Sequence, residues 1–111
     1  MFARLEFVHT PHRKEDFLEK VRHEILPILK AQRGFIDLIP FVPESNMEFG
    51  RVEKLISISL WADKWDAEKY EQDVFPLVQE ILKPFITKPI TIKAYTVDAA
   101  LSEHLAKALA A

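Results

Sequence analysis

The hydrophobic periodicity of this chain changes between strand spacing and helix spacing in an order that is compatible with few folds. Residues 2–9 alternate apolar and polar side chains as a half-buried strand does, and residues 35–42, 52–61 and 89–97 are three further strand candidates. Between the first and second candidates, and between the third and fourth, apolar residues recur every three or four positions, which is the spacing of an amphipathic helix. The predicted order is therefore strand, helix, strand, strand, helix, strand.

Capping and breaking residues indicate where the two helices begin, end and deform. Thr10 is expected to cap the first helix and Gly34 to close it. Pro27 falls within its last turns and should loosen them, because proline supplies no backbone N–H. In the second helix, Asp63 is the expected N-cap, and Pro76 is expected to divide the helix into two pieces.

This element order predicts an α+β domain, a ferredoxin-like βαββαβ sandwich in which two helices cover one side of an antiparallel four-stranded sheet. A length of 111 residues is enough to close one hydrophobic core. We assign residues 1–98 to this domain. Residues 99–111 are predicted to form a C-terminal amphipathic tail helix, since leucine recurs there every four residues.

The two faces of the predicted sheet differ in polarity. The face that we expect the helices to cover collects Leu5, Phe7, Ile36, Leu38, Ile56, Ile58, Leu60, Ile90, Ile92 and Ala94. The opposite face mixes aromatic residues with isolated charges: Phe2, Arg4, Glu6, Phe35, Asp37, Ile39, Phe41, Leu55, Ser57, Ser59, Lys93 and Tyr95. Because exposed apolar surface of that extent marks an interface, a homodimer closed sheet against sheet is predicted. The alternative is that the tail helix folds back over this face.

Charge and cysteine content exclude several classes of function. Lys and Arg total 15 and Asp and Glu 17, so a net charge of −2 gives no broad basic surface for nucleic acid or an anionic membrane. The sequence has no cysteine, which excludes disulfides, thiolate metal sites and a thiol nucleophile and fits a cytoplasmic location. No export signal is visible, and no apolar run approaches the roughly 20 residues that cross a bilayer.

Three segments carry a resemblance to a known family. Residues 31–36 (AQRGFI), 56–65 (ISISLWADKW) and 70–75 (YEQDVF) resemble the antibiotic biosynthesis monooxygenase family of dimeric α/β barrels, over about residues 2–97. The resemblance implies a dimeric α/β barrel. Its implied activities include oxygenation of aromatic polyketides without a cofactor, haem degradation and isomerisation.

Two branches of that superfamily can be compared with this sequence. The haem-degrading branch resembles a pattern of Asn late in the first strand, Trp on the second helix and an axial His further along it. Here those places hold His9, Tyr70 and residues 77–81, which contain no histidine, so no haem is expected. The branch that oxidises phenols to quinones without a cofactor resembles a site of Trp, Tyr and a polar group. Trp65 and Tyr70 could supply its aromatic members, although the expected Asn is absent.

These comparisons and the residue types give five candidate site residues. His9, which ends the first strand on the side that we expect the helices to cover, could act as a general base near neutral pH. Tyr70 could hydrogen-bond the substrate oxygen. Trp65 and Phe75 could stack on an aromatic ring, and Trp61 completes the predicted substrate-binding set. Each also has a purely structural interpretation, as a hydrogen-bonded histidine or as an aromatic residue packed in the core.

Other polar residues are interpreted structurally. Glu6, Ser59 and Tyr95 are expected to hydrogen-bond one another inside the barrel, as buried polar groups do. His9 and His12 lack a third ligand at a metal-binding spacing, so no metal site is expected.

Two functions are therefore compatible with the sequence. The first is a cofactor-independent monooxygenase acting on a small aromatic, phenolic substrate. The second is a non-catalytic or stress-related binding module whose pocket holds a small aromatic or apolar ligand. A titratable His9 beside Tyr70 favours the enzyme, whereas the missing Asn favours the binding module.

Overall fold

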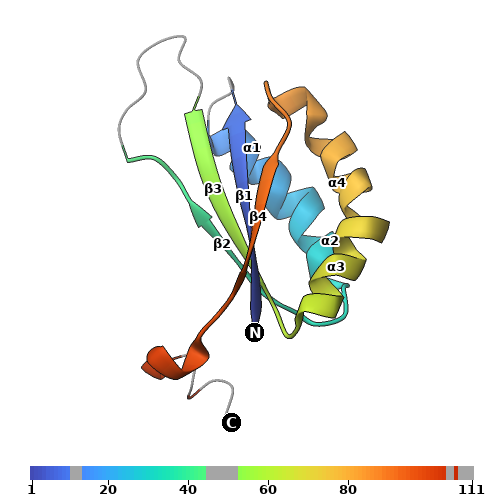
Figure 1. Cartoon of the computed structure of the whole chain (residues 1–111). Coiled ribbons are helices and arrows are strands. Elements are labelled where there is room, and N and C mark those ends of the chain that lie inside the picture. Colours follow the sequence, from blue (N-terminus) through green and yellow to red (C-terminus); the bar gives the residue numbers. More distant parts are fainter. Residues whose placement is uncertain (11–13, 45–52, 105–106, 108–111) are drawn as a thin grey trace.

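The computed structural model describes residues 1–10, 14–44, 53–104 and 107, and it confirms the predicted order of elements (Figure 1). The strands are β1 (Phe2–Thr10), β2 (Phe35–Phe41), β3 (Glu53–Trp61) and β4 (Thr91–Thr96). The first helical region comprises α1 (Lys14–Lys20), the π-helix η1 (Val21–Ile25) and α2 (Leu26–Lys30). The second comprises α3 (Lys64–Asp73), α4 (Phe75–Leu82) and the 3-10 turn η2 (Lys83–Phe85).

The four strands form one antiparallel sheet in the order β2-β3-β1-β4, with β1 and β3 in the centre. The helices α1, α2, α3 and α4 lie on one side of this sheet (Figure 1). The predicted ferredoxin-like α+β sandwich is thus confirmed. Residues 11–13, which follow the expected cap Thr10, lie outside the described residues.

The strand registers correct the predicted assignment of sheet faces in β1 and β3. Arg4 contacts the rings of Tyr70 in α3 and Phe75 in α4, so its face is the one that the helices cover. That face carries Phe2, Arg4, Glu6 and Val8 of β1 opposite Trp61, Ser59, Ser57 and Leu55 of β3. The open face carries Ala3, Leu5 and Phe7 opposite Leu60, Ile58 and Ile56. The prediction was wrong because it placed the charged residues Arg4 and Glu6 away from the helices, whereas they pair with each other in the interior.

The other two strands agree better with the prediction. Leu38 in β2 and Ile92 and Ala94 in β4 lie on the helix-covered face, because they occupy the same register rows as Ser59, Glu6 and Arg4. Phe35 also belongs to this face, contrary to prediction, since it pairs with Trp61 ahead of an irregularity in the β2–β3 register. The predicted bond between Tyr95 and Glu6 is likewise excluded, because Tyr95 pairs with Ala3 on the open face.

Pro27 distorts the first helical region upstream of the position expected. The Leu26 backbone N–H donates to the Val21 carbonyl, a five-residue step that widens the turn before the proline. The helix then continues through Pro27 to Lys30, so its last turn is intact. A wider turn accommodates a residue that has no N–H for the carbonyl of His23, which explains why the distortion precedes the proline.

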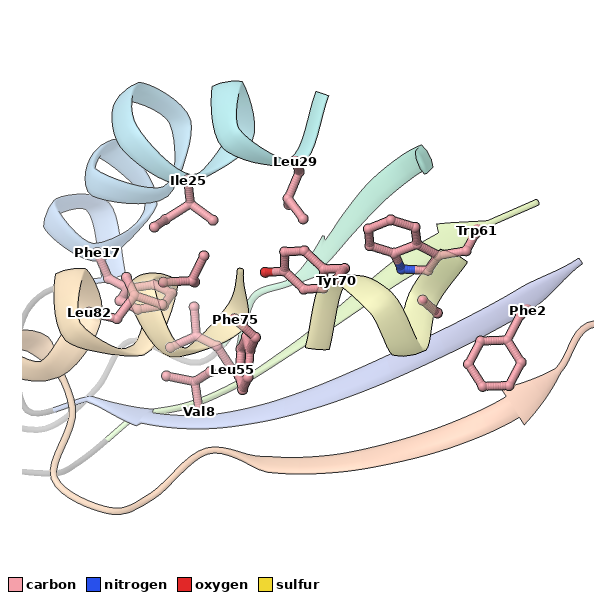
Figure 2. Close-up of a cluster of buried hydrophobic side chains, with 12 residues drawn as sticks. Phe2, Val8, Phe17, Ile25, Leu29, Leu55, Trp61, Tyr70, Phe75 and Leu82 are labelled. Carbon is pink, nitrogen blue, oxygen red and sulfur yellow. The ribbon is translucent and has the colours of Figure 1, made fainter. Parts of the chain in front are cut away.

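The second helical region follows the prediction closely. The Asp63 side chain accepts a hydrogen bond from the Asp66 backbone N–H at 2.9 Å and so caps α3. At Val74, with φ of −120°, the chain departs from helical geometry, and α4 begins at Phe75, directly before Pro76. The break brings the aromatic rings of both helices to the sheet, where they join the buried cluster of Figure 2.

The open face of the sheet exposes several large apolar side chains. Phe41 and Tyr95 are each 50% exposed and Ile39 is 38% exposed. At the end of the chain, Ala99–Leu101 form a 3-10 turn in which Leu101 is 86% exposed, so this part of the tail does not cover the sheet. Much of the predicted tail helix falls on residues 105–106 and 108–111, which lie outside the described residues.

Candidate functional site

A cavity of about 610 Å³ lies between the first helical region and the sheet. Its wall is mostly apolar and is closed at the inner end by α3 and α4. The side chains that form its interior include Val8, Phe17, Leu18, Val21, Ile25, Leu29, Leu38, Leu55, Phe75, Val78 and Leu82. Exposed Lys30, Ile36 and Asp37 also border it, which places an opening between α2 and β2. Cavities of this size and lining are typical of sites for small organic molecules.

A small polar cluster interrupts the apolar layer beneath this cavity. The Arg4 Nη1 atom donates to Glu6 Oε1 at 3.1 Å, and the Ser59 hydroxyl donates to the same carboxylate oxygen at 3.4 Å. The Trp61 indole N–H in turn donates to the Ser59 hydroxyl at 3.0 Å. The side chain of Arg4 is 2% exposed and that of Glu6 is 13% exposed, so these charges are removed from bulk water. Glu6 lines the cavity, together with Ser57 and Tyr70.

Burial makes the Glu6 carboxyl an unusually weak acid, because it raises its pKa. Desolvation disfavours its charged form and raises its pKa from 4.5 to about 7, against the opposing effects of the Arg4 charge and of hydrogen bonds from Ser59 and Ser57. A carboxyl that exchanges its proton near neutral pH, on the wall of an apolar cavity, is equipped for general acid–base chemistry.

Tyr70 has the opposite character, because its proton is held firmly. Burial raises the pKa of its phenol, and the nearby Glu6 charge raises it further, with Arg4 acting in the other direction. The hydroxyl therefore acts as a hydrogen-bond donor and not as a base at neutral pH. In Figure 2 it is directed away from Trp61, toward the side of the core formed by Ile25 and Phe17.

Aromatic rings hold this cluster in place. The Arg4 guanidinium carbon lies 5.0 Å from the centroid of the Tyr70 ring and 4.8 Å from that of Phe75, within the range of cation–π attraction. Trp61, which is fully buried, packs on Tyr70 with centroids 5.0 Å apart and meets the edge of Phe35 at 5.5 Å. These contacts orient Tyr70 and Arg4 from two directions.

The structure brings together three of the five residues predicted from the sequence. Trp61, Tyr70 and Phe75 share one buried cluster, and Tyr70 and Phe75 reach the cavity wall. Trp65 does not join them, since it is 58% exposed and has the exposed Arg33 guanidinium 5.9 Å from its ring. The buried side of α3 carries Ala67 and Tyr70, which leaves Trp65 on the solvent side.

His9 also lies apart from the cavity. It pairs with Lys54 in the row of β1 that continues Leu5 and Phe7, so the alternation of the strand places it on the open face, contrary to the predicted helix-covered side. His12, the histidine three residues further along the chain, lies outside the described residues. Within the described ranges, no three His, Asp or Glu side chains come together as a metal site would require.

Glu6 is a candidate site residue for which the sequence predicts only a structural role. The hydrogen bond from Ser59 that this role implies is present. The signal that could have found it is a charged pair, Arg4 and Glu6, at alternate positions of a central strand whose two faces are both apolar, because such charges cannot face water.

Comparisons with known proteins identify the fold. No family model matches the sequence, and no curated protein matches it. Among solved structures, SnoaB, a cofactor-independent oxygenase from Streptomyces nogalater, aligns with a TM-score of 0.67 and 16% identity over 92% of this chain and 98% of that one. A monooxygenase from the gene ActVA-Orf6 of Streptomyces coelicolor, in complex with the ligand Nanaomycin D, gives 0.68 and 11% over 86% of each chain.

A candidate antibiotic biosynthesis monooxygenase from Bacillus cereus gives a TM-score of 0.58 and 17% identity over 87% of this chain and 90% of that one. The domain therefore has the fold of the antibiotic biosynthesis monooxygenases, as its sequence segments suggested. None of the helices within the described ranges combines the length and the apolarity needed to cross a membrane.

Proposed function

We propose that this protein is a cofactor-independent monooxygenase that oxidises a small phenolic aromatic substrate in the cavity between its helices and its sheet. The observation that supports this most is Glu6, a buried carboxyl with a pKa of about 7 on the wall of an apolar cavity of about 610 Å³. The solved structures of similar fold include oxygenases, one of them described as cofactor-independent, which agrees with this chemistry.

In the proposed reaction the Glu6 carboxylate accepts the phenolic proton of the substrate. The electron-rich phenolate then transfers one electron to dioxygen, and the resulting radical pair combines to form a carbon–oxygen bond. This combination leaves a peroxide anion on the substrate, which takes the phenolic proton back from Glu6. The Glu6 carboxylate then removes the proton of the oxidised C–H as the O–O bond breaks, and passes it to the departing hydroxide. One oxygen atom enters the quinone and the other leaves as water, whose two hydrogens come from the phenolic O–H and the oxidised C–H.

Tyr70 and Phe75 have supporting roles in this proposal. The Tyr70 hydroxyl keeps its proton and donates a hydrogen bond to the substrate oxygen, which favours the phenolate that Glu6 generates. Phe75 supplies an aromatic wall. Trp61 supports Tyr70 by packing against its ring. Neither Trp65 nor His9 borders the cavity.

The test is oxygen uptake with a panel of anthrone-like and naphthol-like phenols, measured on the native chain and on Glu6→Gln, Tyr70→Phe and His9→Ala. Loss of a general base lowers a rate by about 10²- to 10⁴-fold, so Glu6→Gln should be nearly inactive whereas His9→Ala should keep native turnover. If a phenol binds tightly to the native chain without oxygen uptake, the site is a binding module and the enzymatic proposal is wrong.

We also propose that two copies of the chain close sheet against sheet through the open face. Leu5, Phe7, Ile56 and Ile58 form its half-buried centre and Phe41 and Tyr95 its exposed margin. An apolar surface of this kind on the uncovered side of a sheet is characteristic of an interface, and a two-fold symmetric dimer is the commonest way to cover it.

We further propose a cytoplasmic location, with which the absence of cysteine is compatible.

A further inference from the structure

A second hollow lies on the other side of Arg4 from the cavity. It is a groove of about 370 Å³ between α3 and the edge strand β4, where the helical layer stops short of the sheet edge. Ile92 and Ala94 of β4 form its apolar side, and Lys64, Glu68 and Glu71 of α3 form its polar side. Arg4 lines this groove and not the cavity, whereas Glu6 lines the cavity and not the groove. The guanidinium therefore stands between the two hollows.

Arg4 has more hydrogen-bond donors than acceptors around it. Its Nη1 atom is bonded to Glu6 at 3.1 Å. Its Nη2 atom lies 3.7 Å from Glu71 Oε1, which is beyond hydrogen-bond distance, and within the described part of the chain neither Nε nor Nη2 has an acceptor. Both atoms are buried. An unpaired donor on a buried cation costs free energy, so a hydrogen-bond acceptor supplied by a ligand would stabilise Arg4.

The two free nitrogens have a particular relation to each other. The N–H groups of Nε and of Nη2 point to the same side of the planar guanidinium, and together they match the two oxygens of a carboxylate. Nη2 lies on the groove side of the guanidinium, because the Glu71 carboxylate 3.7 Å from it belongs to a lining residue of the groove.

We propose that the groove between α3 and β4 is a binding site for a small monocarboxylate. Its carboxylate pairs with the Nε and Nη2 atoms of Arg4, and its apolar body lies against Ile92 and Ala94. The Glu71 carboxylate, which is half exposed, moves aside when the ligand binds. This proposal does not rest on the oxygenase reaction, since it concerns a different hollow and a different residue.

The charges around the groove limit the ligand to a single negative charge. The Lys64 Nζ atom lies 3.6 Å from Glu68 Oε1, so the charges of these two side chains largely offset each other. Arg4 faces Glu71 from one side and Glu6 from the other. With Glu71 displaced toward solvent and Glu6 protonated, one cation remains for one carboxylate, whereas a dianion would also be repelled by Glu71 and Glu68.

The probe for this site is benzoate, titrated into the full chain by isothermal calorimetry and by backbone amide NMR. We expect a Kd on the order of 1 mM or tighter, with shifts concentrated on β4 and α3. Glu71→Gln removes the competing carboxylate and should tighten binding severalfold. Ala94→Phe fills the groove beside Arg4, its cross-strand neighbour, and should abolish binding. Glu80→Gln, on the exposed side of α4, is the matched control and should bind as the native chain does.

Arg4→Lys keeps the charge but loses the paired donors, so it should weaken benzoate binding at least tenfold. If this variant fails to fold, Ala94→Phe still decides the matter. No benzoate binding by the native chain would overturn the proposal, and so would binding that survives Ala94→Phe. Neither result would affect the oxygen uptake assigned to Glu6.

Discussion

Replacing Glu6 by glutamine should make the protein more stable at neutral pH and leave its stability in acid unchanged. The folded-state pKa of about 7 lies above the unfolded value of 4.5, so folding opposes ionisation of this carboxyl. Below about pH 4.5 the group is protonated in both states and costs nothing. As the pH rises toward 7, the unfolded chain ionises while the folded chain does not, and the free energy of unfolding falls. Above pH 7 the loss levels off.

The size of the effect follows from the same two values. One pKa unit corresponds to about 1.4 kcal/mol, so a change from 4.5 to about 7 costs on the order of 3 kcal/mol at full ionisation. The side chain is only 13% exposed, so solvent screening does little to reduce this cost. Glutamine keeps the hydrogen-bonding shape of the protonated acid and avoids the loss entirely.

Urea unfolding followed by tryptophan fluorescence, at a fixed protein concentration from pH 4.5 to 8, measures the difference between the two proteins. We expect the variant to gain about 3 kcal/mol over the native chain between the ends of this range. Glu80→Gln is the matched surface control and should change the unfolding free energy by less than about 0.5 kcal/mol at every pH. A Glu6→Gln difference that is independent of pH would show that Glu6 ionises normally, and the assignment of the base would be wrong.

Three further outcomes are expected. Gly34→Ala should lower the unfolding free energy by about 1 to 3 kcal/mol in chemical denaturation, because Gly34 has φ of +78° and a Cβ there would overlap the buried Asp66 side chain; unchanged stability would contradict this packing. Ile39→Glu should convert the proposed dimer to a folded monomer near 12.9 kDa in sedimentation equilibrium, since Ile39 is already 38% exposed within one chain; a native chain of that mass would disprove the dimer. Titration with haem should give no sharp histidine-ligated Soret band, and such a band at one haem per chain would mean that a residue outside the proposed site ligates iron.

The order of the elements could be predicted because each one carries its own periodicity and its own ends. Asp63 caps α3 and Pro76 lies in the first turn of α4, as local chemistry requires, whatever packs around them. The choice of sheet face is not local. In β1 the alternate set with Leu5 and Phe7 is the more apolar, so the period of two favours burying it, whereas the helices cover the set with Arg4. The π-helix η1 is likewise not a local feature, because it depends on how the whole helical region accommodates Pro27.

The site was only partly predictable for the same reason. Tyr70 and Phe75 point inward because they lie on the apolar side of their helices, and that pattern is visible in the sequence. The residue type of Trp65 predicts a pocket residue, but its position on α3 places it in solvent. The importance of Glu6 arises from its burial beside Arg4, and burial of a charged pair requires knowledge of the tertiary contacts.

The pH dependence of oxygen uptake, with the phenol that the panel selects, tests the central claim most directly. If Glu6 is the base, kcat/KM of the native chain should rise with pH and level off above a midpoint near 7, where the free carboxyl loses its proton. His9→Ala should give the same curve, and Glu6→Gln should give a low rate with no such midpoint. A midpoint near 7 that persists in Glu6→Gln and disappears in His9→Ala would contradict the account.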